Sequence, residues 1–210
     1  MASIRGFRWV GLATLAITVV VALAFLRGRV AEAHQQHHGW FPISGNWTIR
    51  GDVVSNTHYG RGDMMLIRNP DGSDYSISAQ VRFDLLFAET HYGDAGLIIR
   101  TSDPQPGVDS YKGYYAGLRP DSQTVVLGRA SYEWRLLQEA KLNVPISSDE
   151  WYGLKLTAHG CTLEVTATPP GHGPATQIRY QDSDCLTSGV AGLRSFYADA
   201  SWRNVKVVPF

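Results

Sequence analysis

The stretch DAGLIIRTSDPQPGVDSYKGYYAGLRPDSQTVVLGR, residues 94–129, decides the fold because it predicts three successive strands of one sheet system. Residues 96–99 form an apolar run too short for a helix of ordinary length, which is typical of a strand covered on both faces. Residues 111–118 predict a second strand. The turn at residues 119–122 has proline at its second position, which favours reversal of the chain into a third strand at residues 124–127. The stretch therefore predicts a hairpin beside a buried strand.

Two flanking regions show the period-two pattern of half-buried strands. Between residues 75 and 85, apolar side chains at odd positions alternate with polar ones, so one face of this strand is dry and the other is wet. Residues 152–158 and 161–167 alternate similarly around a two-residue turn at His159-Gly160, which predicts a second hairpin. No convincing amphipathic helix follows the N-terminal segment. We therefore expect an all-β fold, an antiparallel jelly-roll β-sandwich, over residues 40–210.

The length and charge of the chain exclude one class of partner. The chain has 210 residues, of which the sandwich would use about 170, enough for a substantial core in a single domain. Its 19 lysine and arginine residues balance its 19 aspartate and glutamate residues, and no basic stripe interleaved with aromatic residues occurs. Because the chain has no net positive charge that would attract a polyanion such as nucleic acid, we expect no nucleic-acid partner.

The N-terminus predicts a membrane anchor. Residues 9–26 are free of charge and apolar enough to span a bilayer as one helix, so residues 1–29 are interpreted as a single-pass transmembrane anchor. The alternative is a cleaved signal peptide, because Ala31-Glu32-Ala33 offers small residues for cleavage. Residues 30–39 form a polar linker whose histidines are interpreted as part of a tether and not as a metal site. The sandwich is expected on the periplasmic or extracellular side of the cell membrane.

The cysteine count limits metal and redox chemistry. Cys161 and Cys185 are the only cysteines, which excludes a four-thiolate zinc site. They form either one disulfide, as is common outside the cytoplasm, or two buried thiols.

Several short motifs are spread along the expected strands: residues 113–118 (GYYAGL), 127–129 (LGR), Trp134, residues 151–155 (WYGLK), 158–160 (AHG), Asp182, residues 189–193 and residues 204–205. Taken together, they resemble the concanavalin A-like lectin/glucanase superfamily. The branches most similar are the fructan-binding-module type and the bacterial keto-disaccharide-hydrolase-like domains. The resemblance covers about residues 40–210, and it implies a jelly-roll fold more firmly than an activity.

Catalysis receives little support from the residues. A glycoside hydrolase needs two carboxyl groups that act as an acid and as a nucleophile or base. The laminarinase-like members of this superfamily place them in a Glu-x-Asp-x-x-Glu motif, which is absent from this chain. No serine or cysteine nucleophile has a recognisable elbow, and no histidine pair has zinc spacing. We therefore expect a protein that is not an enzyme.

A binding role needs only a platform of aromatic and polar side chains. Tyr115 and Trp134 are candidates to stack on a sugar, and Arg100 and Asp109 are candidates to hydrogen-bond it. Tyr114 and Trp151 are interpreted as core residues, since buried aromatic rings are common in sandwiches.

Asp182 and Asp184 form a candidate calcium site, because spacing by two places both carboxylates on one side of a strand. An acidic turn that leads to Cys185 is the simpler interpretation, since calcium takes six to eight oxygen ligands. No other cofactor is expected.

Three functions remain open at this stage. The first is a non-catalytic, membrane-anchored sandwich that acts as an extrinsic accessory subunit of a membrane protein complex and contacts integral membrane proteins. The anchor favours this role, because a lone lectin-like domain has no attached enzyme to deliver. The second is a carbohydrate-binding, lectin-like module whose partner is a glycan. The third is a glycoside hydrolase of the keto-disaccharide type.

Overall fold

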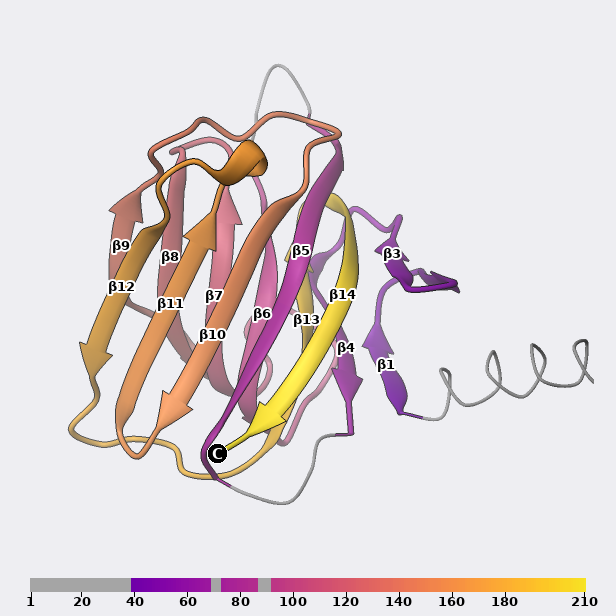
Figure 1. Ribbon diagram of the computed structural model, residues 1–210. Coiled ribbons are helices and arrows are strands. Elements are labelled where there is room, and N and C mark those ends of the chain that lie inside the picture. The colour runs from indigo at the N-terminus through magenta and orange to yellow at the C-terminus, as the bar shows by residue number, and fades with distance from the viewer. Residues whose placement is uncertain (1–38, 69–72, 87–91) are drawn as a thin grey trace, which may run out of the picture. The chain divides into compact units, whose positions relative to one another are not determined.

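The computed structural model describes residues 39–68, 73–86 and 92–210, and this part of the chain is an antiparallel sandwich of two seven-stranded sheets (Figure 1). Sheet A consists, in spatial order, of β1 (Trp40–Ser44), β4 (Arg61–Ile67), β13 (Val190–Phe196), β6 (Asp94–Ser102), β7 (Lys112–Arg119), β8 (Thr124–Ser131) and β9 (Trp134–Lys141). Sheet B consists of β12 (Thr176–Gln181), β11 (Thr162–Thr168), β10 (Tyr152–His159), β5 (Tyr75–Leu85), β14 (Asp199–Pro209), β3 (Val53–Asn56) and β2 (Trp47–Arg50). The predicted antiparallel sandwich is confirmed, and the three predicted strands of residues 94–129 are the neighbours β6, β7 and β8.

The main core lies between the two sheets. The odd-numbered residues of β5 from Tyr75 to Phe83 point into it, as the period-two pattern predicts. Sheet A contributes Leu97 and Ile99 from β6. Trp202 of β14 is fully buried, and its indole Nε1 donates a hydrogen bond to the Gly96 carbonyl at 3.1 Å. Because this bond satisfies the one polar atom of the ring, the largest core side chain ties the two sheets together.

A second apolar cluster covers the outer face of sheet A. Ile98, Tyr115 and Val126 point away from the main core, yet each is buried. Tyr111, from the loop between β6 and β7, and Trp134, at the start of β9, pack over them. The run at residues 96–99 is therefore buried on both faces of the sheet, which confirms the prediction from its uninterrupted apolar character.

The hairpin of β10 and β11 differs from the sequence prediction by one residue. His159 pairs with Thr162, so the turn consists of Gly160 and Cys161, not of His159 and Gly160. Gly160 has a φ of 52°, a left-handed conformation that glycine adopts without strain. From this turn Cys161 bonds to Cys185, with the two Cα atoms 5.4 Å apart.

The predicted anchor (residues 1–29) and almost all of the linker (residues 30–38) lie outside the described residues. Within the described ranges, no helix has the length and apolar character needed to cross a bilayer. The compact unit that contains both sheets runs from Gly39 to Phe210.

Candidate functional site

A pocket of about 350 Å³ opens on the outer face of sheet A, beside the second apolar cluster, and is called the sheet A pocket below. Its walls come from six strands of the sheet, from the loop between β6 and β7 and from the segment just before β6. The lining residues are Arg61, Tyr92, Asp94, Val108, Asp109, Tyr115, Arg119, Val126, Trp134, Arg194 and Phe196.

Two glycines make room for the aromatic wall. A Cβ atom at Gly117 would lie 2.1 Å from the Tyr115 hydroxyl oxygen, and one at Gly128 would lie 2.1 Å from the Trp134 ring. Only glycine at these positions lets both rings lie flat against the strands. The two rings then meet edge to face, with centroids 5.9 Å apart. The GYYAGL and LGR segments are thus the local cause of the pocket's shape.

A buried cation lies at the centre of the pocket's polar wall. Arg194 of β13 is only 4% exposed, and its Nη1 and Nη2 donate to Asp94 Oδ1 at 3.1 Å and to Asp109 Oδ1 at 2.9 Å. Its guanidinium also lies 4.7 Å from the centroid of the Tyr115 ring. The Tyr115 hydroxyl donates to Asp94 Oδ1 at 2.6 Å, so the four side chains form one network. Arg194 Nε is buried and finds no acceptor among the described residues.

Burial and mutual attraction set the ionisation of this network. Burial raises the pKa of Asp94, although the Arg194 charge and the Tyr115 hydrogen bond oppose that shift. Burial also disfavours the charged form of Arg194, but the surrounding Tyr111, Asp94, Tyr115 and Asp109 outweigh it, so the pKa of Arg194 is raised. Arg194 is therefore always a cation, and it presents fixed donors next to two carboxylate acceptors.

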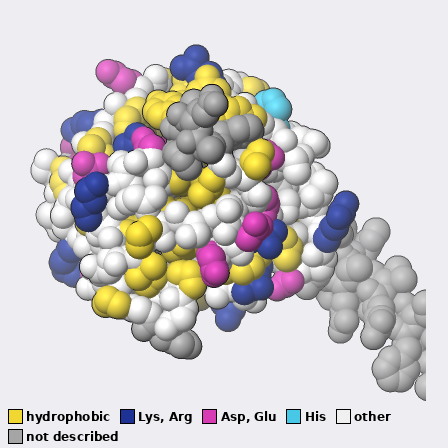
Figure 2. Space-filling view, turned by 90° about the horizontal axis from the view of Figure 1, so that it is seen from above, with side chains coloured by type: hydrophobic (Ala, Val, Ile, Leu, Met, Phe, Trp, Pro, Cys, Tyr) yellow, Lys and Arg dark blue, Asp and Glu magenta, His cyan; other side chains and the backbone are white. Residues whose placement is uncertain are grey.

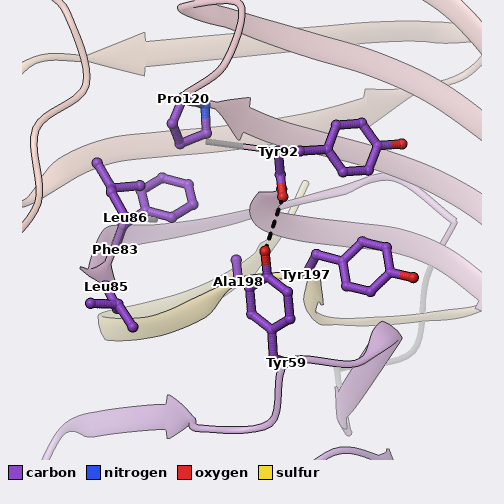
Figure 3. Close-up of a pocket in the computed structure, with 9 residues that line it drawn as sticks. Tyr59, Phe83, Leu85, Leu86, Tyr92, Pro120, Tyr197 and Ala198 are labelled. Atoms are coloured by element: carbon purple, nitrogen blue, oxygen red, sulfur yellow. Dashed lines mark hydrogen bonds between the residues drawn. The ribbon is translucent and has the colours of Figure 1, made fainter. Parts of the chain in front are cut away.

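Aromatic residues continue from the pocket toward one end of the sandwich. Tyr92 is 49% exposed and lines both the sheet A pocket and a neighbouring hollow of about 10 Å³ (Figure 3). The hollow is about the size of one water molecule, too small for a sugar ring. Tyrosine rings lie on one side of it and aliphatic side chains on the other: Tyr59, Tyr92 and Tyr197 against Leu85, Leu86 and Pro120. Viewed from above, this end of the molecule shows apolar side chains among scattered acidic and basic ones (Figure 2).

The structure brings three of the four predicted ligand-binding residues together. Tyr115, Trp134 and Asp109 all line the sheet A pocket. Arg100 does not: it is 1% exposed, and its Nη1 donates to the carbonyls of Gly160 and Leu186 at 2.8 and 2.6 Å. Its Nε donates to the Ser73 carbonyl and its Nη2 to Asp74 Oδ1, so Arg100 holds loops together and does not line the sheet A pocket.

Sequence reasoning missed Asp94 and Arg194. One signal was available for Arg194, because it interrupts the otherwise apolar and small-residue strand VAGLRSF. A charge in a strand buried on both faces requires a partner, and that requirement points to a polar site.

The predicted calcium ligands are engaged in another way. Asp182 is buried, accepts a hydrogen bond from the Tyr114 hydroxyl at 2.7 Å and faces Arg129 Nη1 at 3.2 Å. These hydrogen bonds and the Arg129 charge outweigh burial and lower the pKa of Asp182. The Asp184 side chain is 94% exposed. A guanidinium already neutralises the buried carboxylate, and the described residues contain no group of three metal-ligating side chains, so this pair does not fit a calcium ion.

No family model and no curated protein matches the sequence. Solved structures do match the fold. The carbohydrate-binding module CBM66 from Bacillus subtilis aligns with a TM-score of 0.66 and 19% identity, over 81% of this chain and 95% of that one. The exoplasmic/lumenal domain of VIP36, in a form bound to Ca²⁺ and Man2, gives 0.63 and 13%, over 81% of each chain. A legume lectin-like domain from Entamoeba histolytica gives 0.59 and 11%, over 82% and 90%.

These similarities agree with the resemblance seen in the sequence motifs. At such low identities they establish the architecture alone. The described part of this chain shares its two-sheet sandwich fold with these three structures.

Proposed function

We propose that the protein is a carbohydrate-binding, lectin-like domain and that the sheet A pocket holds the glycan. The observation that carries this proposal is the buried Arg194, clamped between Asp94 and Asp109 in the wall of an open pocket. The N–H donors of Arg194 lie next to the carboxylate acceptors of Asp94 and Asp109. Such a pairing suits neighbouring sugar hydroxyl groups, each of which can donate and accept a hydrogen bond. The pocket volume of about 350 Å³ also falls in the range of small-ligand sites.

The aromatic wall supplies the apolar half of such a site. Trp134 is partly exposed over Gly128, and Phe196 and Tyr92 lie on the other side of the pocket. The C–H faces of a sugar stack on aromatic rings of this kind, while its hydroxyl groups reach the charged wall. Two of the similar structures support the proposal by analogy. CBM66 is a carbohydrate-binding module, and VIP36 was solved in a form bound to Ca²⁺ and Man2.

Binding is favoured over hydrolysis at this site. Asp94 and Asp109 form the kind of carboxylate pair that a keto-disaccharide hydrolase would need. However, both accept hydrogen bonds from the same buried guanidinium, so each carboxylate already has a partner within the protein. A hydrolase needs one carboxyl group that can transfer a proton to the glycosidic oxygen, so the arrangement suits a glycan ligand better than a glycan substrate.

The role of accessory subunit in a membrane complex stays a prediction. It depends on residues 1–29, which lie outside the described residues, and the fold similarities favour the carbohydrate-binding alternative.

The proposal is tested by calorimetric titration with fructans and neutral cell-wall polysaccharides. Trp134→Ala should weaken the binding of the glycan that is found by roughly tenfold, the loss expected from about 1.4 kcal/mol of ring contact. Trp151→Ala is the matched control, because Trp151 packs between Arg82 and Arg203, outside the sheet A pocket. Equal loss in both variants, or no heat from any glycan, would refute the proposal. Release of reducing sugar during the titration would favour the hydrolase.

A further inference from the structure

Sheet B lies toward the viewer in Figure 1, and its outer face carries a second groove, on the opposite sheet from the sheet A pocket. Its volume is about 580 Å³, and it is called the sheet B groove below. Its wall includes Lys155, Lys206, Gln80, Thr166 and Thr168, with Gly153 in its floor. No step of the proposed glycan function uses it.

Strand pairing places these side chains in two rows on one face. In the first row, Thr166, Lys155, Ser78 and Lys206 lie side by side on β11, β10, β5 and β14. Because neighbouring strands are about 4.8 Å apart, the two lysines lie two strands, or roughly 10 Å, apart across Ser78. The second row consists of Thr168, Gly153, Gln80 and Arg203.

A bulge in β14 brings both of its cations to this face. Arg203 pairs with Gln80 and Lys206 pairs with Ser78, so β14 has one more residue than β5 in this interval. Asn204 takes up the bulge with a φ of 54°, and Val205 packs against the main core. A regular strand would turn one of Arg203 and Lys206 inward, since side chains alternate between faces and these two residues are an odd number apart.

The charges of the two lysines are not neutralised within the described part of the chain. Two other cations of this face are paired, Arg82 with Asp84 and Arg179 with Glu164. Lys155 and Lys206 have no ion pair with a described residue, and Arg203 donates its Nε to the neutral Gln80 side chain at 2.6 Å. The groove therefore carries a local positive charge in a molecule whose formal net charge is zero.

We propose that the sheet B groove binds an acidic polysaccharide, with acid groups at Lys155 and Lys206 and sugar hydroxyl groups at Gln80, Thr166 and Thr168. Charge complementarity selects an anion, and the hydroxyl and amide side chains between the cations suit a hydroxyl-rich polymer. The absence of a side chain at Gly153 leaves space for a sugar ring between the rows. A bilayer surface fits less well, because an interfacial site would present large apolar side chains, and the groove wall has none that is exposed.

The test measures binding of polygalacturonate, a polymer of uronic acids, to the full chain at low salt, with neutral dextran of similar length as the reference. We expect binding of polygalacturonate but not of dextran, and weaker binding as salt rises. Lys155→Gln/Lys206→Gln should weaken it roughly tenfold, within the range for two exposed ion pairs. The matched control is Lys112→Gln/Lys141→Gln, which removes the same charge from β7 and β9 of sheet A.

Each outcome decides the proposal. Equal weakening by both double variants would mean non-specific attraction and would overturn it, as would a failure of polygalacturonate to bind. Lysine-dependent binding to vesicles of phosphatidylserine and phosphatidylcholine that exceeds binding to the polymer would identify a membrane surface and overturn it as well. Trp134→Ala should leave polygalacturonate binding unchanged, so that a failure of the glycan pocket and a failure of this groove can be told apart.

Discussion

The two outer faces of the sandwich have opposite characters, although both belong to seven-stranded antiparallel sheets. Sheet A is covered on the outside by a second apolar cluster, under the loop between β6 and β7 and under Trp134. The outer face of sheet B is polar and open. The buried ion network of Arg194 lies where the cover of sheet A meets the sheet A pocket. The cover of sheet A shields the charge of Arg194 from water, whereas Lys155 and Lys206 on the open face of sheet B are exposed to solvent.

The largest expected effect comes from removing the buried charge of sheet A. Arg194→Met should lower the free energy of unfolding by about 3–5 kcal/mol, because Asp94 and Asp109 would lose the cation that compensates them. Arg203→Met on sheet B loses a contact with the Trp151 ring and should cost only about 0.5–1 kcal/mol. Urea unfolding curves of the two variants measure both values. Similar losses would mean that the two faces are energetically equivalent.

A smaller effect is expected from the disulfide, which belongs to neither binding face. Cys161→Ser/Cys185→Ser should lower the free energy of unfolding by about 3 kcal/mol, since the bond joins residues 24 positions apart and restricts the unfolded chain. Binding of a neutral glycan and of polygalacturonate should both persist in the folded variant. The measurement is urea unfolding with and without a reductant, followed by titration. Loss of one binding activity alone would show that the bond shapes that face.

Replacement of a glycine by alanine should have different effects on the two faces. Gly128→Ala places a Cβ atom 2.1 Å from the Trp134 ring, so the ring must move, at a cost of about 1–3 kcal/mol, and glycan affinity should fall. Gly153→Ala in the sheet B groove meets its nearest atom, of Thr168, at 3.3 Å and should be nearly neutral for stability. Thermal unfolding and titration with a neutral glycan distinguish the variants. Unchanged glycan affinity in Gly128→Ala would contradict the role given to Trp134.

The smallest effect is a pH dependence of stability that comes from two carboxylates whose pKa values are shifted in opposite directions. Burial raises the pKa of Asp94 above 3.8, so its contribution to stability is complete below that value and is lost as pH rises through the raised pKa. The pKa of Asp182 is lowered by its hydrogen bonds and by Arg129, so its contribution is present above 3.8 and is lost as pH falls through the lowered pKa. Urea midpoints over a pH series should show that Asp94→Asn removes a decline with rising pH. Asp182→Asn should instead remove a decline with falling pH, and slopes of the same sign would contradict this assignment.

The fold was largely predictable because side-chain periodicity reports burial directly. The alternation in β5 and the unbroken run in β6 correctly indicated a one-sided and a two-sided strand. The turn of the β10–β11 hairpin was displaced by one residue, because a left-handed glycine can stand at either position of a two-residue turn.

The site was predictable only in part. Tyr115 and Trp134, which were candidates because aromatic side chains are visible in the sequence, line the same pocket. The Asp94–Arg194–Asp109 network was not predicted, because its members are far apart in the chain and are joined only by the pairing of β6 with β13 and by a loop. Arg100 was misassigned for a related reason: backbone carbonyls satisfy it, and a sequence does not show where carbonyls point.

The two edge strands of sheet A, β1 and β9, affect whether neighbouring molecules can pair through their sheets. β1 contains Pro42, which has no N–H to offer, and β9 carries Arg135, Glu139 and Lys141 along its length. Proline and charge on an outermost strand discourage a strand of another molecule from adding to the sheet. Molecules held close together are therefore hindered from pairing through the edges of sheet A.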